Sequence, residues 1–160
     1  MSTSFTEGLN AAQREAVLYL DGPCLVLAGA GSGKTRVITQ KIAYLLVDCA
    51  YPSRNVLALT FTNKAAREME DRVKRLVDPS VAKGLTISTF HSLGVKILRE
   101  EAHHAGLKPQ FSIFDSDDAL AIIQDLLATT DRGRLRSVQQ TISLWKNAML
   151  DPDAAANIAA

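Results

Sequence analysis

Cysteine, long apolar runs and an excess of either charge are all scarce in this sequence of 160 residues. Its two cysteines, Cys24 and Cys49, are too few for a disulfide framework, and they predict a reduced, cytoplasmic protein. No apolar stretch approaches the ~20 residues of a membrane span, and the N-terminus lacks a basic region followed by an apolar run. We therefore expect neither secretion nor a membrane partner. Lys and Arg number 18 against 17 Asp and Glu, so the overall charge does not indicate a nucleic-acid partner.

The sequence does have the apolar content of a globular domain, since 47% of its residues are hydrophobic. Short apolar runs alternate with stripes of apolar residues at helical spacing, a pattern that predicts an α/β fold with a parallel sheet. The expected strands are residues 24–28, 56–60 and 85–88, and the expected helices lie within residues 9–20, 38–49, 66–76 and 90–98. Asn10 is the expected N-cap of the first of these helices.

The pattern changes beyond about residue 110. Residues 111–114 form the last strand-like run, and Asp115 followed by Asp118 resembles a capping box at the start of a helix. Residues 132–136 interrupt the helical pattern before another apolar stripe begins. The sequence therefore predicts a sheet-containing part, residues 1–110, and an all-helical part, residues 111–160.

The sharpest motif lies between an expected strand and an expected helix, as a phosphate-binding loop does. Its glycines let backbone N–H groups crowd around an anion, and the following helix adds its positive dipole end. Lys34 would reach the β- and γ-phosphates of ATP, and the Thr35 hydroxyl would bind magnesium, so these two are the expected catalytic residues. The usual pattern begins with Gly where this chain has the small residue Ala28. The expected nucleotide-binding loop is Ala28, Gly29, Ala30, Gly31, Ser32, Gly33, Lys34 and Thr35.

The carboxylate that such a loop needs to hold the metal through water is missing from the pattern. No apolar run ends in Asp-Glu or Asp-Asp, and the nearest candidate, Asp115, is better explained as the N-cap of the next helix. The sequence thus predicts a nucleotide site with an incomplete catalytic apparatus.

Polar and aromatic side chains follow two of the expected strands, where open parallel sheets bind ligands. Residues 60–69 and 87–92 each combine hydroxyls, an amide or imidazole and an aromatic ring. Such groups can bind backbone phosphates and stack on the bases of single-stranded DNA. A second interpretation stays open at this point, in which the hydroxyls cap helices while Phe61 and Phe90 fill the core.

Together the motifs resemble the start of a superfamily 1 DNA helicase of the Rep/UvrD/PcrA kind. Residues 9–17 resemble the family's Q motif, whose glutamine, here Gln13, reads the adenine edge. Arg36 stands where the family places an arginine close to the nucleotide. The order and spacing of the motifs also agree with the family. The remaining matches are residues 28–35 to its Walker A loop, 60–69 to its motif Ia and 87–92 to its motif Ib, the last two of which touch single-stranded DNA.

The resemblance covers nearly the whole chain, and residues 111–118 and 141–147 look most like the Rep branch of the family. It implies an incomplete P-loop (RecA-like) domain, called 1A, in residues 1–110, followed by the start of a helical accessory subdomain, 1B, in residues 111–160. Family members are several hundred residues long and carry the metal carboxylate, the arginine finger and a second RecA-like domain further along. The chain therefore resembles an N-terminal fragment.

For function, the resemblance implies ATP-driven movement 3′ to 5′ along single-stranded DNA and unwinding at duplex–single-strand junctions, with the remainder of the helicase chain as a partner. It assigns nucleotide contacts to Gln13 and Arg36 beside the loop itself. The implied DNA contacts are Phe61, Asn63, Lys64, Thr89, Phe90 and His91.

Two other functions stay open. A small P-loop kinase has a similar length, and the arginines of residues 132–136 would serve as its phosphate-closing lid, but it requires a metal carboxylate within the chain. The third possibility is a nucleotide- or DNA-binding module that never hydrolyses ATP. Such a module is what a truncated helicase would be.

Overall fold

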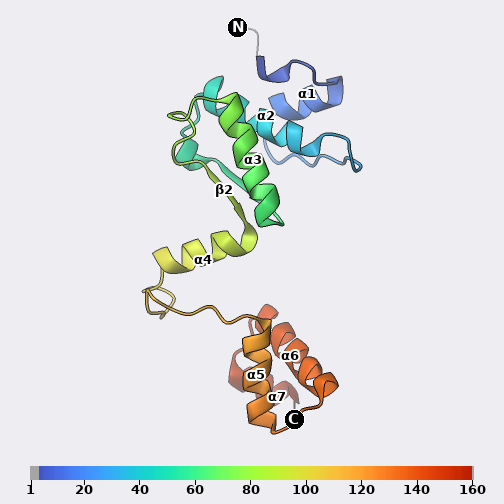
Figure 1. The fold of residues 1–160 in the computed structure, drawn as a ribbon, viewed down its shortest axis with the longest axis vertical. Coiled ribbons are helices and arrows are strands. Elements are labelled where there is room, and N and C mark those ends of the chain that lie inside the picture. Colours follow the sequence, from blue (N-terminus) through green and yellow to red (C-terminus); the bar gives the residue numbers. More distant parts are fainter. Residues whose placement is uncertain (1–3, 160) are drawn as a thin grey trace. The chain divides into compact units, whose positions relative to one another are not determined.

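A computed structural model describes residues 4–159 (Figure 1). The chain divides into two compact units, Met1–Pro109 and Gln110–Ala160. The first unit is mixed α/β and the second is helical. No helix within the described residues is long and apolar enough to cross a membrane. The elements of the first unit are η1 (Ser4–Thr6), α1 (Ala11–Leu18), α2 (Lys34–Val47), η2 (Ser53–Asn55), β1 (Leu57–Thr60), α3 (Asn63–Leu76), β2 (Thr86–Thr89) and α4 (Phe90–Glu100). Those of the second are α5 (Ser116–Leu127), α6 (Arg132–Asn147) and α7 (Pro152–Ala159).

The sheet in the described part of the chain has two parallel strands, β1 and β2, joined by the crossover helix α3. Leu57 pairs with Thr86 and Thr60 with Thr89, so both strands end at the same edge. The expected strands at residues 56–60 and 85–88 are therefore confirmed to within one residue. The α/β class with parallel strands is confirmed with them.

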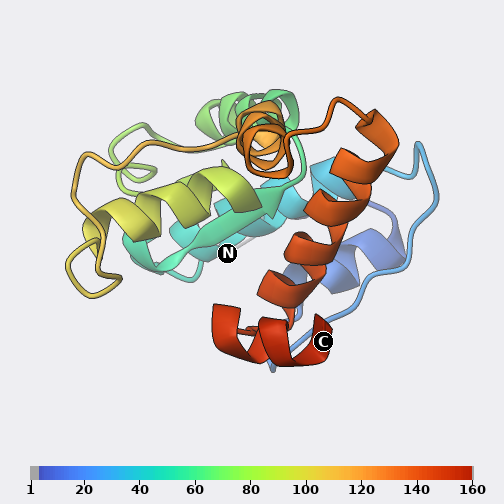
Figure 2. The same ribbon diagram turned by 90° about the horizontal axis from the view of Figure 1, so that it is seen from below.

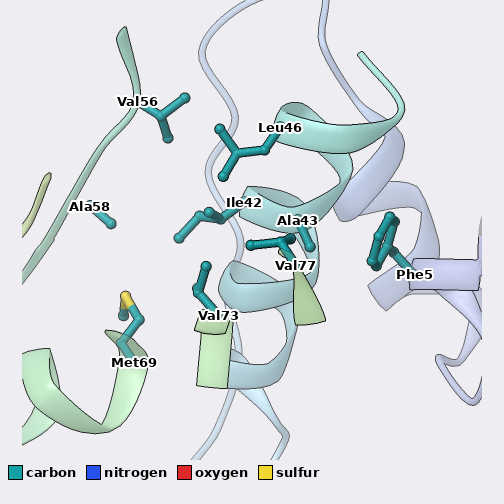
Figure 3. Close-up of a cluster of buried hydrophobic side chains, with 9 residues drawn as sticks. All are labelled: Phe5, Ile42, Ala43, Leu46, Val56, Ala58, Met69, Val73 and Val77. Atoms are coloured by element: carbon teal, nitrogen blue, oxygen red, sulfur yellow. The ribbon is translucent and has the colours of Figure 1, made fainter. Parts of the chain in front are cut away.

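The core of the first unit forms around α2, which packs against α1 on one side and α3 on the other. One apolar cluster joins α2, α3, β1 and the residues beside them, as Figure 3 shows. A smaller cluster of Leu9, Val17 and Val37 fixes α1 against α2. The members of the larger cluster are Phe5, Ile42, Ala43, Leu46, Val56, Ala58, Met69, Val73 and Val77.

Met69 offers a direct test of this core, because its side chain is only 4% exposed within the larger cluster. Met69→Ala is expected to lower the free energy of unfolding of the first unit by about 2–5 kcal/mol, since it removes buried apolar surface and leaves a cavity. Met149, which is 90% exposed, provides the matched control, and Met149→Ala should change stability by less than about 0.5 kcal/mol. Urea unfolding followed by circular dichroism measures both, and equal effects would contradict the packing described.

The strand expected over residues 24–28 is wrong. The whole segment between α1 and α2 runs without helix or strand, as the pale blue tube of Figures 1 and 2 shows. Leu25 and Leu27 are 84% and 86% exposed. A strand requires a neighbour for its backbone hydrogen bonds, and within residues 4–159 β1 and β2 pair only with each other. Apolar composition alone therefore did not make this run a strand.

The second unit contains a helical hairpin of α5 and α6 with buried Ile123 and Leu135. Gln139 Nε2 of α6 donates to the carbonyl oxygen of Ser116 at 2.8 Å and so holds the start of α5. The capping box expected at Asp115 is confirmed, because its carboxylate accepts from the N–H groups of residues 117 and 118, and Asp118 accepts from Asp115 N–H.

Two expectations for this region are wrong. Residues 111–114 form no strand, and Ile113 and Phe114 are 59% and 64% exposed in an irregular segment without a pairing partner. Residues 132–136 do not interrupt a helix but begin α6, because the Asp131 carboxylate accepts the N–H groups of Gly133 and Arg134 at 2.8 and 3.2 Å. An N-cap placed just before the segment thus started the helix earlier than the apolar stripe indicated.

Candidate functional site

The glycine-rich loop, residues 28–35, leads directly into α2. Gly31 and Gly33 have φ values of +75° and +83°, in the left-handed region that favours glycine. Gly33 is the N-cap of α2 and has no side chain to cap the helix, so no cap side chain pairs with the first N–H groups. An uncapped helix N-terminus with its positive dipole end attracts anions.

Lys34 folds back over this loop. Its ammonium donates to the carbonyl oxygens of Ala28 at 3.1 Å and Gly29 at 2.6 Å. The Ser32 hydroxyl donates to the same Gly29 oxygen at 2.7 Å. Because Lys34 is exposed, its charge is accessible to an anionic ligand at the mouth of the loop.

Gln13 on α1 connects that helix to the loop. Its Oε1 accepts from the Asn10 N–H at 3.0 Å, and its Nε2 donates to the Ser32 carbonyl oxygen at 3.0 Å. A Cβ added at Gly33 would lie 3.2 Å from the same Nε2, so glycine is what permits this close approach. Arg36 points elsewhere, because its Nη2 donates to the Glu7 carbonyl oxygen at 3.3 Å. The structure thus brings Gln13 and Lys34 to one loop and directs Arg36 towards the segment before α1.

A hollow of about 640 Å³ lies between α1, residues 24–29 and α2. Gln13, Lys34 and apolar side chains such as Val26 and Ile38 line it. Its volume falls in the range of small-molecule sites, roughly 300–1,000 Å³. None of the described residues that line it carries a carboxylate. The hollow and the loop together offer an apolar wall beside a cationic, donor-rich rim.

A second group of expected residues gathers where β1 and β2 end. The rings of Phe61 and Phe90 lie 6.0 Å apart between centroids, with their planes inclined by 48°. Phe61 is 90% exposed and Phe90 57%, so the interpretation that they fill the core is wrong. The capping part of that interpretation is confirmed, because Thr62 and Thr89 are the N-caps of α3 and α4.

Polar side chains also connect the residues that follow β1 with those at the end of β2. The Thr89 hydroxyl, in a residue only 5% exposed, donates to Ser92 Oγ at 2.9 Å and accepts from Ser92 N–H at 3.2 Å. Asn63 Oδ1 lies 3.5 Å from both hydroxyl oxygens. Lys64 and His91 are exposed beside them. Of the six residues expected to contact DNA, Thr89 alone is buried.

The residue that sequence reasoning missed at this site is Asn10. The sequence pattern predicted only that Asn10 is an N-cap. In the structure its backbone N–H also donates to the Gln13 side-chain amide, while its Oδ1 accepts from Gln13 N–H at 2.9 Å. The signal was present, because Asn10 followed by glutamine three residues later is a capping-box pattern.

A glycine-rich loop that enters a helix through Gly-Lys-Thr is typical of nucleotide-binding proteins. The family model of the UvrD/REP helicase N-terminal domain matches residues 9–159, and the chain belongs to this family. It is 51% identical over 151 residues to the ATP-dependent DNA helicase Rep of Escherichia coli (strain K12), covering 92% of this chain and 22% of that protein. It is 44% identical over 163 residues to the ATP-dependent DNA helicase PcrA of Bacillus subtilis (strain 168), covering 99% of this chain. The chain spans 22% of the length of each of these relatives. The family resemblance drawn from the motifs is thereby confirmed.

Proposed function

We propose that this chain supplies the ATP-binding part of a cytoplasmic DNA helicase. In this proposal residues 1–110 are part of a P-loop domain of RecA-like fold, 1A, and residues 111–160 begin the helical subdomain 1B. The observation that carries it is the convergence of Gln13 and Lys34 on one glycine-rich loop beside a hollow of ligand size, in a chain of the UvrD/REP family. Titration of a fluorescent ATP analogue into the chain tests it.

ATP would enter with its base in the hollow and its phosphates over the loop. Lys34 would exchange its two carbonyl acceptors for charged β- and γ-phosphate oxygens, which form stronger hydrogen bonds. The first N–H groups of α2 would bind further phosphate oxygens. Gln13 would read the adenine edge. Arg36 would approach the nucleotide only after leaving the Glu7 carbonyl oxygen.

Thr35 would hold magnesium at the start of α2. Its side chain is half-buried, and its hydroxyl has no hydrogen-bond partner within residues 4–159, so an oxygen ligand is available there. Magnesium prefers oxygen ligands and is commonly held by one or two protein groups together with substrate phosphates. When bound, it would neutralise charge on the phosphates.

Single-stranded DNA would cross the ends of β1 and β2. Phe61 and Phe90 present exposed ring faces for base stacking, and Lys64 provides a cation for a phosphate. Asn63 and His91 add polar groups for the backbone, whereas the buried Thr89 would support the turn instead of touching DNA. In the whole helicase, ATP hydrolysis would drive movement 3′ to 5′ along this strand and unwinding at duplex–single-strand junctions, with the remainder of the helicase completing both sites.

Phe61→Ala is expected to weaken binding of an oligo-dT strand about 5- to 150-fold at low salt, because stacking on one ring is worth roughly 1–3 kcal/mol per base. Lys64→Ala should also weaken binding and should reduce its salt dependence. Fluorescence anisotropy measures both effects. Since Phe61 is exposed, its loss should leave folding and ATP binding intact.

The matched control places the same kind of change in the second unit, where Arg132, Arg134 and Arg136 begin α6. Replacing these arginines with alanine should affect oligo-dT binding less than Lys64→Ala does. The reverse ranking would move the DNA site to the helical unit and refute the roles given to Phe61 and Lys64.

A further inference from the structure

The Gln13 amide uses only part of its hydrogen-bonding capacity within the protein. A primary amide has an oxygen with two acceptor positions and a nitrogen with two donor hydrogens. In this chain Oε1 accepts one hydrogen bond from Asn10 N–H, and Nε2 donates one to the Ser32 carbonyl oxygen. Within residues 4–159, one acceptor position and one donor hydrogen of this amide therefore remain without a partner, on a side chain that lines the hollow.

The two backbone partners also determine which way the amide is turned. Were the amide rotated by half a turn, its NH₂ group would meet the Asn10 N–H, and its oxygen would meet the Ser32 carbonyl oxygen. The first contact would place a donor against a donor, and the second an acceptor against an acceptor. Both hydrogen bonds, each 3.0 Å long in the observed orientation, would be lost. Asn10 and Ser32 thus fix the side on which the remaining donor and acceptor are presented.

A fixed donor and acceptor pair distinguishes the two purines. Adenine offers the N6 amino group as a donor beside the N7 acceptor, whereas guanine offers two acceptors, O6 and N7. The remaining donor and acceptor of the Gln13 amide complement N7 and N6 of adenine. In guanine the amide acceptor would face the O6 acceptor, and no hydrogen bond would form there. An amide free to turn would lose part of this discrimination.

We propose that Asn10 is a positioning residue that sets the preference for adenine over guanine by holding the orientation of the Gln13 amide. This inference rests on the proposed function as an ATP-binding domain. The group responsible is the backbone N–H of Asn10, and its side chain has a separate task, because Oδ1 caps α1 through Gln13 N–H.

The two tasks of Asn10 are separable by mutation. Asn10→Ala removes the cap and keeps the backbone N–H, whereas Asn10→Pro removes both. Asn10 has φ −71°, which lies within the range of the proline ring, about −65 ± 15°. Asn10→Ser keeps both the N–H and a good capping hydroxyl. Comparison of the alanine and proline variants therefore isolates the N–H that anchors the amide.

The experiment measures the affinities of fluorescent ATP and GTP analogues for the wild-type chain and the three variants. Asn10→Ser and Asn10→Ala should keep the ratio of the two affinities within about twofold of wild type. Asn10→Pro should lower the preference for ATP about tenfold, as expected for loss of one hydrogen bond that orients the amide. A purely structural role would weaken both analogues equally and leave the ratio unchanged, which would overturn the proposal.

A second measurement needs no variant. In the wild-type chain with the ATP analogue bound, the Asn10 N–H should exchange with solvent at least tenfold more slowly than the N–H of Ala11, an exposed residue that does not line the hollow. Exchange of Asn10 at the same rate as Ala11 would overturn the proposal even if the proline variant did not fold. Absence of Lys34-dependent ATP binding would overturn the proposed function and this inference together, whereas ATP binding without preference over GTP would overturn this inference alone.

Discussion

Lys34→Ala is expected to weaken binding of ATP about 10- to 150-fold. Lys34 Nζ lies 3.1 and 2.6 Å from two carbonyl oxygens of the loop, so its charge already lies where phosphates would be bound. A hydrogen bond to a charged group contributes about 1.5–3 kcal/mol, and each 1.4 kcal/mol changes affinity tenfold. Titration of a fluorescent ATP analogue with magnesium measures the change.

Lys83→Ala is a suitable control, because Lys83 is an exposed lysine of the same unit that lies in the turn before β2. It changes the net charge by the same amount and should leave ATP affinity within about twofold. Equal affinities of the wild-type chain and Lys34→Ala would show that the loop does not bind phosphates. A large effect of Lys83→Ala would show that general electrostatic attraction, not a specific contact, governs binding.

The sequence predicted the parts of the fold whose causes are local. Asn10 and Asp115 begin α1 and α5 because each carries its capping partner three residues away, within the same few residues that the pattern displays. The strands β1 and β2 were also predictable, because α3 between them returns the chain to a parallel neighbour. These elements find their partners inside the first unit or within one turn of helix.

The sequence did not show which apolar runs would find a pairing partner. Residues 24–28 are more apolar than residues 56–60, which end in Thr60, yet among the described residues only the second run has a neighbour to share its backbone hydrogen bonds. The exposed Leu25 and Leu27 show the consequence. Apolar composition indicates that a segment can be buried, but pairing across the sheet decides whether it is a strand.

In the candidate site, too, features set by neighbouring residues were predictable, whereas contacts between distant residues were not. The order Gly-Lys-Thr placed Lys34 on the loop, because the loop and the helix that follows are contiguous in sequence. The contact of Gln13 with Ser32 joins residues 19 apart, and the pairing of Phe61 with Phe90 depends on the register of β1 against β2. Resemblance to a family named these residues, but only the folded chain shows how they meet.

Hydrolysis of ATP by the 160-residue chain is expected to be slower than by a complete helicase by about 10³- to 10⁵-fold. An arginine that reaches the transferred phosphoryl group is worth that much in P-loop enzymes, and they also hold the metal with a carboxylate. No Asp or Glu among the described residues lines the hollow beside the loop. Asp115, the nearest candidate that the sequence offered for this role, caps α5 through two N–H groups at 2.8 and 2.9 Å.

Phosphate release, measured with and without single-stranded DNA, tests this expectation, and Lys34→Ala provides the background rate. The wild-type chain should bind ATP yet release phosphate at nearly the rate of that variant, because in the proposed function Lys34 and the α2 N-terminus hold the phosphates, whereas no carboxylate among the described residues lines the hollow. Rapid DNA-stimulated hydrolysis abolished by Asp115→Asn would contradict both the incomplete site and the capping role of Asp115. Rapid hydrolysis that is abolished by Lys34→Ala but not by Asp115→Asn would also contradict the expectation. It would require another carboxylate to hold the metal, and none of the described Asp or Glu residues lines the hollow.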